Sequence, residues 1–207
     1  MVLVNCVKMM MVTGRSRGMT TLWSSVWAAV VVSFLIVAQA KAQDPELGDD
    51  GLYHTSWFLD SFLELKDDVE ETTAKGKRLA IFWELKGCPY CKETHFTNLT
   101  RDDISEFMQA NFEVIQLNIL GSRMVVDIDG EELTEKQLRN KYGIRYTPTL
   151  QFFGTDVGAM AKLKPKQREV ARLQGYLKPK HFLAMLQYVQ SGSFETMNFR
   201  KFLKVRK

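Results

Sequence analysis

Two cysteines, Cys88 and Cys91, stand two residues apart in the stretch LKGCPYCKETHF. Such a pair can cycle between dithiol and disulfide, bind a metal ion or attach haem. Haem attachment needs a histidine directly after the second cysteine, and Lys92 holds that position. A structural zinc site needs four ligands, whereas the pair and His95 supply three. Redox chemistry is therefore favoured without a metal ion or other cofactor, and His95 is predicted to be an ordinary residue on a helix surface.

The first 42 residues have the composition of a secretory signal. They contain no Asp or Glu, and Arg15 and Arg17 precede an apolar run from Val26 to Ala38. The segment ends in the small-x-small pattern Ala40-Lys41-Ala42, which is typical of a cleavage site. We predict export, with a periplasmic location in a bacterium; an uncleaved segment would instead anchor the chain in the membrane.

Removing residues 1–42 would also change the charge and the cysteine count. Four basic residues would be lost, so that 28 Lys and Arg become 24 against 24 Asp and Glu. A neutral chain gives no support to nucleic-acid binding. Cys6 would be lost too, leaving Cys88 and Cys91 as the remaining thiols. A disulfide between them closes too short a loop to add much chain-entropy stability, so a catalytic role is the better hypothesis.

The segments around the cysteines predict an α/β domain. Apolar residues from Trp57 to Val69 recur at helical spacing and predict a helix that ends near Lys75-Gly76. The run RLAIFWEL predicts a buried strand that leads directly into the cysteines. The later predicted elements are a helical segment at 92–112, a strand at 112–119, a hairpin at Asp129-Gly130, a helix capped by Thr134 and Gln137, an extended run from Pro148, a strand at 168–176 and a helix from Pro179.

A strand, a tight turn, two cysteines and a helix form the arrangement that a redox dithiol needs. The free N–H groups and partial positive charge of a helix N-terminus favour the thiolate. Cys88 would be the exposed attacking thiolate, with Pro89 in the first turn. Cys91 would lie about one turn deeper and act as the resolving thiol. We expect Cys88 to be largely thiolate at neutral pH.

Three segments resemble the thioredoxin superfamily: RLAIFWELKGCPYCK, YGIRYTPTLQFF and the Gly175 element before the last helix. The resemblance covers about residues 56–191. It implies a thioredoxin-like α/β fold, with a central mixed β-sheet flanked by helices on both faces. More narrowly, GCPYCKETHF, DGEELTEKQLRNKYGIRYTPTLQFF and GYLKPKHFLAMLQYV resemble the periplasmic SoxW-type thioredoxins of bacterial sulfur-oxidation clusters.

The resemblance also implies roles for residues outside the pair. Thr147 and Pro148 would form a cis bond packed against the disulfide, and the backbone there would pair with an extended substrate segment. Pro89, Tyr90 and Gly175 would support the site and its substrate surface. The buried acid of cytoplasmic thioredoxins is replaced by Phe82, and the tryptophan before their first cysteine by Gly87. This leaves Glu84 as a candidate proton acceptor for Cys91, with a surface carboxylate paired to a lysine as the alternative.

The chain is thus predicted to comprise a signal peptide or anchor (1–42), a linker (43–55), a thioredoxin-like domain (56–191) and a basic C-terminal tail (192–207). The predicted function is a monomeric exported thiol-disulfide oxidoreductase that reduces partner-protein disulfides. The resemblance implies a sulfur-oxidation carrier protein as partner and a membrane electron donor. The alternatives are a thiol oxidant or isomerase, a glutaredoxin-like enzyme, a metal chaperone and a non-catalytic binding module. The glutaredoxin-like alternative comes from the Pro-Tyr dipeptide between the cysteines, which resembles that of glutaredoxins.

Overall fold

The computed structural model describes residues 44–206. The predicted signal segment, residues 1–42, lies outside this part of the chain. Within residues 44–206, no helix is both long enough and apolar enough to cross a membrane.

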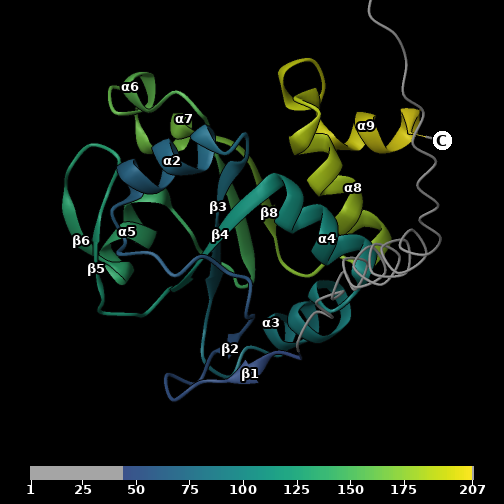
Figure 1. Ribbon diagram of the computed structural model, residues 1–207, viewed down its shortest axis with the longest axis horizontal. Helices are drawn as coiled ribbons and strands as arrows, with labels where there is room; N and C mark the ends of the chain where they lie inside the picture. Colours follow the sequence, from purple (N-terminus) through teal and green to yellow (C-terminus); the bar gives the residue numbers. More distant parts are fainter. Residues whose placement is uncertain (1–43, 207) are drawn as a thin grey trace, which may run out of the picture. The chain divides into compact units, whose positions relative to one another are not determined.

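A four-stranded sheet forms the centre of the domain, with the order β4-β3-β7-β8 (Figure 1). Its strands are β3 (Arg78–Glu84), β4 (Phe112–Asn118), β7 (Thr149–Phe153) and β8 (Glu169–Gln174). The pair β3 and β4 is parallel, whereas β7 runs antiparallel to both β3 and β8. The sheet is therefore mixed, as predicted, and β3 lies inside it with a strand on each side.

Two small sheets accompany the central one. The first pairs β1 (Glu46–Leu47) with β2 (Tyr53–His54). The second pairs β5 (Met124–Val126) with β6 (Glu132–Thr134), and its connection contains Asp129 and Gly130, which confirms the predicted hairpin.

Alternating side chains of β3 belong to two hydrophobic cores, one on each face of the sheet. Leu79, Ile81 and Trp83 point into a core shared with α2 (Leu65–Ala74), α5 (Glu135–Tyr142) and α6 (Val157–Met160). Ala80 and Phe82 point into the opposite core, which α4 (Asp102–Asn111) and α8 (Pro179–Gln190) cover (Figure 1). Helices on both faces of a mixed sheet confirm the predicted thioredoxin-like fold class.

The first helix is shorter than predicted, because α2 begins at Leu65 rather than near Trp57. Leu63 just before it has φ of +63°, which a right-handed helix cannot include. Trp57 and Phe58 lie in an irregular segment and pack against the core that α4 and α8 cover, so their apolar side chains do not mark a helix face. Phe62 is 98% exposed. Helical spacing over residues 57–64 was thus misleading.

The helix after the hairpin has the predicted start. The Thr134 hydroxyl accepts the N–H of Gln137, and the Gln137 side chain accepts the N–H of Thr134, which completes a capping box. Gly143 ends α5 in the left-handed conformation, with φ of +65°.

The residues after α8 fold back onto the domain. They form η2 (Ser193–Glu195) and α9 (Phe199–Val205). The rings of Phe199 and Phe202 lie 5.5 and 5.3 Å from that of Tyr188 on α8, and the Tyr188 hydroxyl donates to the carbonyl of Met197 at 2.7 Å. The basic side chains of this segment are thus carried on a helix whose aromatic face packs on α8.

Candidate active site

The two cysteines lie where β3 leads into a short helix, α3 (Pro89–Glu93). Gly87, with φ of +75°, makes the turn, and Cys88 is the N-cap residue of α3. Cys88 and Cys91 form a disulfide with Cα atoms 5.3 Å apart, and the N–H of Cys91 donates to Cys88 Sγ at 3.1 Å. Cys91 is 3% exposed, whereas Cys88 is partly exposed. Of the two sulfurs, that of Cys88 is therefore the more accessible to a partner.

A second loop approaches the disulfide from the start of β7. The Thr147–Pro148 bond is cis, as the resemblance implied, and the Thr147 hydroxyl donates to Cys88 Sγ at 3.4 Å. The N–H of Gly175, at the end of β8, donates to the carbonyl of Pro148 at 2.8 Å. The fold thus brings together three segments that are far apart in the sequence.

Aromatic side chains form the surface beside Cys88. Tyr90 is 60% exposed, and its ring stacks on that of Tyr176 with centroids 6.3 Å apart and planes 15° apart. These rings, Pro89 and Glu93 line a pocket of about 440 Å³. Partial burial and the Glu93 carboxylate raise the pKa of Tyr176. Tyr176 and Glu93 were not predicted as site residues, although the position of Tyr176 directly after Gly175 was a usable signal.

Glu84, the last residue of β3, is a buried carboxylate with 1% exposure rather than a surface group paired to a lysine. His95 Nε2 lies 3.0 and 3.1 Å from its two oxygens, and the Gln116 amide also donates to it. His95 Nδ1 in turn lies 2.8 Å from the hydroxyl of Thr55. The prediction of His95 as a helix-surface residue is wrong, because this side chain is 0% exposed.

The helix that carries His95 also differs from the prediction. After α3 the backbone continues as a π-helix, η1 (Thr94–Leu99), instead of the α-helix that the composition indicated. The wider turn buries Thr94 and His95 together with Asn98 and Leu99. Spacing at 3.6 residues per turn already places His95 on the face of Cys91, so the surface prediction came from the polar character of the side chain and not from the periodicity. A histidine four residues after the second cysteine was the available signal.

Lys92 and His95, which follow the cysteines, both have local partners. Lys92 Nζ lies 5.7 Å from the ring centre of Tyr53 and 5.8 Å from that of Phe96, which is cation–π geometry. Both ring nitrogens of His95 are engaged by Glu84 and Thr55. Within residues 44–206, no group of three or more His, Cys, Asp or Glu side chains is arranged to hold a metal ion.

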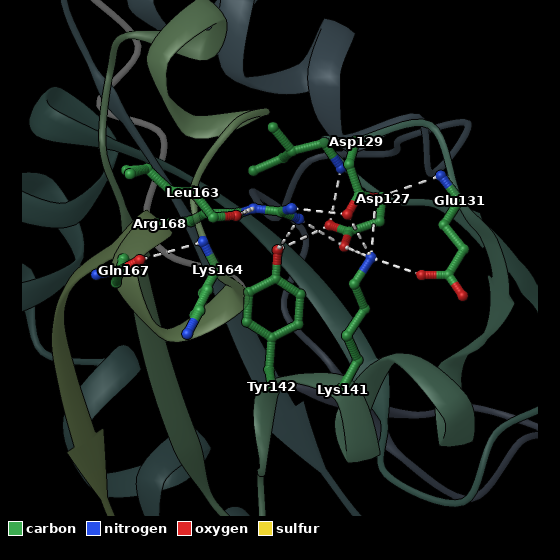
Figure 2. Close-up of polar contacts among 10 residues, drawn as sticks. Asp127, Asp129, Glu131, Lys141, Tyr142, Leu163, Lys164, Gln167 and Arg168 are labelled. Atoms are coloured by element: carbon green, nitrogen blue, oxygen red, sulfur yellow. Dashed lines mark hydrogen bonds and ion pairs between the residues drawn. The ribbon is translucent and has the colours of Figure 1, made fainter.

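A second polar cluster lies between the β5–β6 hairpin, α5 and α7 (Pro165–Arg168), and it fixes these elements together (Figure 2). Asp127 is 0% exposed; Arg168 Nη1 lies 2.8 Å from its Oδ2, and the Tyr142 hydroxyl donates to its Oδ1 at 2.7 Å. Arg168 Nη2 reaches Asp129 at 2.7 Å, and Lys141 Nζ lies within 2.8 Å of Asp127, Asp129 and Glu131. These three carboxylates are thus paired with two of the protein's own cations.

A mixed sheet with a Cys-x-x-Cys disulfide at a helix N-terminus and a cis-proline loop beside it defines a thiol-disulfide oxidoreductase of the thioredoxin-fold class. A family model described as a Thioredoxin-like domain matches residues 65–190, and the chain belongs to this family. No curated protein matches the chain.

Solved structures with a similar fold include proteins from several bacteria. A thioredoxin-fold protein from Helicobacter pylori is 17% identical, with a TM-score of 0.49 over 62% of this chain and 83% of the other. A thioredoxin from Thermus thermophilus is 22% identical, with a TM-score of 0.46 over 61% of this chain and 83% of the other. The oxidised C-terminal domain of DsbD from Neisseria meningitidis is 15% identical, with a TM-score of 0.41 over 59% of this chain and 90% of the other.

Proposed function

We propose that this protein is an exported reductase of protein disulfides that works through Cys88 and Cys91. The observation that carries the proposal is the unequal exposure of the two sulfurs at the start of α3. Cys88 attacks a partner disulfide and forms a mixed disulfide. Cys91 then attacks Cys88, which releases the partner thiol and leaves the Cys88–Cys91 disulfide. An external electron donor must reduce this disulfide before the next turnover.

Thr147, Pro148 and Gly175 hold the partner segment beside Cys88 in this proposal. The carbonyl and N–H groups at the start of β7 are suited to pair with an extended chain by strand addition. Pro89 and Tyr90, with Tyr176, offer an apolar surface for the side chains of that segment. Glu84 accepts the proton of Cys91 during the second attack, since it is a buried carboxylate at the end of the strand that leads into the cysteines.

The sequence supports the cellular context of this proposal. The predicted signal at residues 1–42 supports export, and the SoxW-like segments support a role in sulfur oxidation. The partner would then be a carrier protein whose cysteine must be kept reduced, and the donor would be a membrane protein. A thiol oxidant is the competing function, because the same dithiol chemistry runs in both directions.

Two variants test the chemistry. Cys88→Ser should abolish the reduction of insulin disulfides with dithiothreitol as donor, because no attacking sulfur remains. Cys91→Ser should instead accumulate a mixed disulfide, because the intermediate cannot be resolved. Undiminished turnover by Cys88→Ser would overturn the proposal, and proteins trapped on exported Cys91→Ser would identify the partner.

The direction of electron flow is tested by the reduction potential of the Cys88/Cys91 couple. A reductase is expected near the value of thioredoxin, about −270 mV, whereas a potential near that of DsbA, about −120 mV, would indicate an oxidant. Equilibration with glutathione at several ratios of reduced to oxidised form measures this potential directly.

A further inference from the structure

The Glu84–His95 pair is enclosed by the protein and yet connected to a second, polar pocket. Thr55, which hydrogen-bonds His95, and Gln116, which hydrogen-bonds Glu84, both line a pocket of about 240 Å³. None of the residues that line this pocket belongs to the active-site turn, to α3 or to the Thr147–Pro148 loop. The pair is therefore one hydrogen bond away from a pocket that is distinct from the surface around Cys88.

The cysteine end of this path lies on the same helical run as the histidine. Cys91 and His95 are four residues apart across α3 and η1, and both side chains are buried, at 3% and 0% exposure. Residues at this spacing share one face of a helix. Glu84 contacts His95 from β3, and His95 contacts Thr55, so these three buried groups form a continuous chain of hydrogen bonds beside the helix face that carries Cys91.

Apolar rings close most of the remaining space around the imidazole. The rings of Phe82 and Phe58 lie 5.5 and 6.0 Å from that of His95, and Tyr53 lies 6.2 Å away. The Lys92 ammonium group lies over the ring of Tyr53. The charged or titratable side chains that face the pocket are Asp50, His54, Asp60 and Arg123. The Thr55 hydroxyl is thus the direct polar link that His95 makes toward the pocket.

We propose that Glu84, His95 and Thr55 form a proton relay that connects the resolving cysteine to this polar pocket. The proposal rests on the role of Cys91 as resolving thiol. A buried thiol must lose its proton each time it attacks and regain it when the disulfide is reduced. The relay lets both transfers occur while a bound partner covers Cys88.

The proton balance of the resolving step is as follows. The S–H bond of Cys91 breaks and its proton passes to the Glu84 carboxylate, while the new bond between Cys91 and Cys88 forms and the bond from Cys88 to the partner sulfur breaks. The partner leaves as a thiolate. Glu84 then gives a proton to His95 Nε2, His95 gives the proton on Nδ1 to Thr55, and the Thr55 hydroxyl passes its own proton to water in the pocket. Reduction of the disulfide by the electron donor runs the relay in reverse, which restores the imidazole tautomer.

Single-turnover kinetics with 5,5′-dithiobis(2-nitrobenzoate) separate the two cysteines. In a protein without Cys6, the reduced form releases one coloured thiolate when Cys88 attacks and a second when Cys91 resolves the mixed disulfide. Glu84→Gln should slow the second release about 100-fold, which is within the range for a lost general base. Thr55→Val, which removes the hydroxyl at nearly constant size, should slow it about 10-fold. The rate of the second release by Thr55→Val should then rise with pH, because hydroxide must reach the Cys91 thiol directly.

The controls distinguish a relay from a structural role. Thr55→Ser keeps the hydroxyl and should restore the rate, and Thr72→Val makes the same change at another buried threonine, on α2. The first release should stay within about twofold of the wild type in every variant. The relay is overturned if Thr55→Val resolves at the wild-type rate with the wild-type pH profile, or if Thr72→Val is equally slow. A wild-type protein that resolves rapidly but does not reduce insulin would instead overturn the proposed function and leave the relay intact.

Discussion

The Thr147 hydroxyl donates a hydrogen bond to Cys88 Sγ at 3.4 Å, which ties the cis-proline loop to the sulfur that faces the partner. Residues 59 positions apart in the sequence thereby share one reaction centre. A donor at this point stabilises the negative charge of the Cys88 thiolate, which is the attacking form of this cysteine.

Removal of this donor should make Cys88 less reactive. In Thr147→Val, we expect alkylation of Cys88 by iodoacetamide to be about fivefold slower at acidic pH, where most of Cys88 is protonated, the equivalent of about 1 kcal/mol for one hydrogen bond. The measurement uses the Cys6→Ser/Cys91→Ser background, so that one thiol reacts. Thr147→Ser retains the hydroxyl and should react at the unsubstituted rate; equal slowing in both variants would contradict the assignment.

Arg168 should be essential for stability, since it neutralises the buried Asp127 (Figure 2). Arg168→Met leaves that carboxylate with Lys141 and Tyr142 alone, and we expect a loss of about 3 kcal/mol in the free energy of unfolding, as for other broken buried pairs. Urea denaturation measures this loss. The double variant Arg168→Met/Asp127→Asn should lose less than the sum of the two single changes. A single-variant loss below about 1 kcal/mol would contradict this account.

Asp129 should contribute acid-sensitive stability. Burial opposes its ionisation, but hydrogen bonds from Lys141 and Arg168 outweigh that effect and lower the pKa of Asp129 from 3.8 to about 2. Because the folded-state pKa is depressed, the contribution is present above about pH 4 and is lost as the pH falls toward 2. We expect Asp129→Asn to lower the unfolding free energy by about 1 kcal/mol at pH 7, after allowance for solvent screening.

The measurement is a series of urea denaturations from pH 2 to pH 7. The difference between the wild type and Asp129→Asn should shrink across the acid range. A difference that stays constant down to pH 2 would mean that the loss comes from packing rather than from the charge of Asp129.

The C-terminal helix should stabilise the domain rather than act as a free tail. Phe202 packs 5.3 Å from Tyr188, centroid to centroid, and joins the core that α4 and α8 cover. Phe202→Ala should therefore cost about 1 to 2 kcal/mol. Lys201→Ala changes an exposed neighbour and should stay within about 0.5 kcal/mol of the wild type. Thermal unfolding of both variants tests this, and equal melting temperatures would argue against a packed helix.

Much of the fold could be predicted because its signals are local. The apolar run before Cys88, the hairpin at Asp129-Gly130 and the Thr134 capping box each depend on a few adjacent residues whose chemistry determines the conformation. The two cysteines and Pro148 could be assigned to one site through a resemblance that covers most of the chain. Their spatial meeting, however, is a property of the sheet order and not of any single segment.

The features that could not be predicted depend on tertiary contacts. Trp57 and Phe58 follow helical spacing, but burial against the sheet holds them in an irregular segment. His95 is polar and lies among helix formers, so its burial requires Glu84, Gln116 and Thr55 to meet it from other elements. Sequence patterns contain no record of such partners. The Glu84–His95 pair was therefore visible only in three dimensions.

The π-helical turn of η1 makes the length of this segment as important as its composition. A π-turn holds one residue more than an α-turn, and it can be regarded as an insertion within a regular helix. Deleting Thr97 would remove the extra residue and close the π-turn to an α-turn, which would change the backbone path beside the buried His95. Homologous proteins that use His95 in the same way should therefore conserve the number of residues between Cys91 and Leu99, whereas the exposed turn at Gly130 can vary in length.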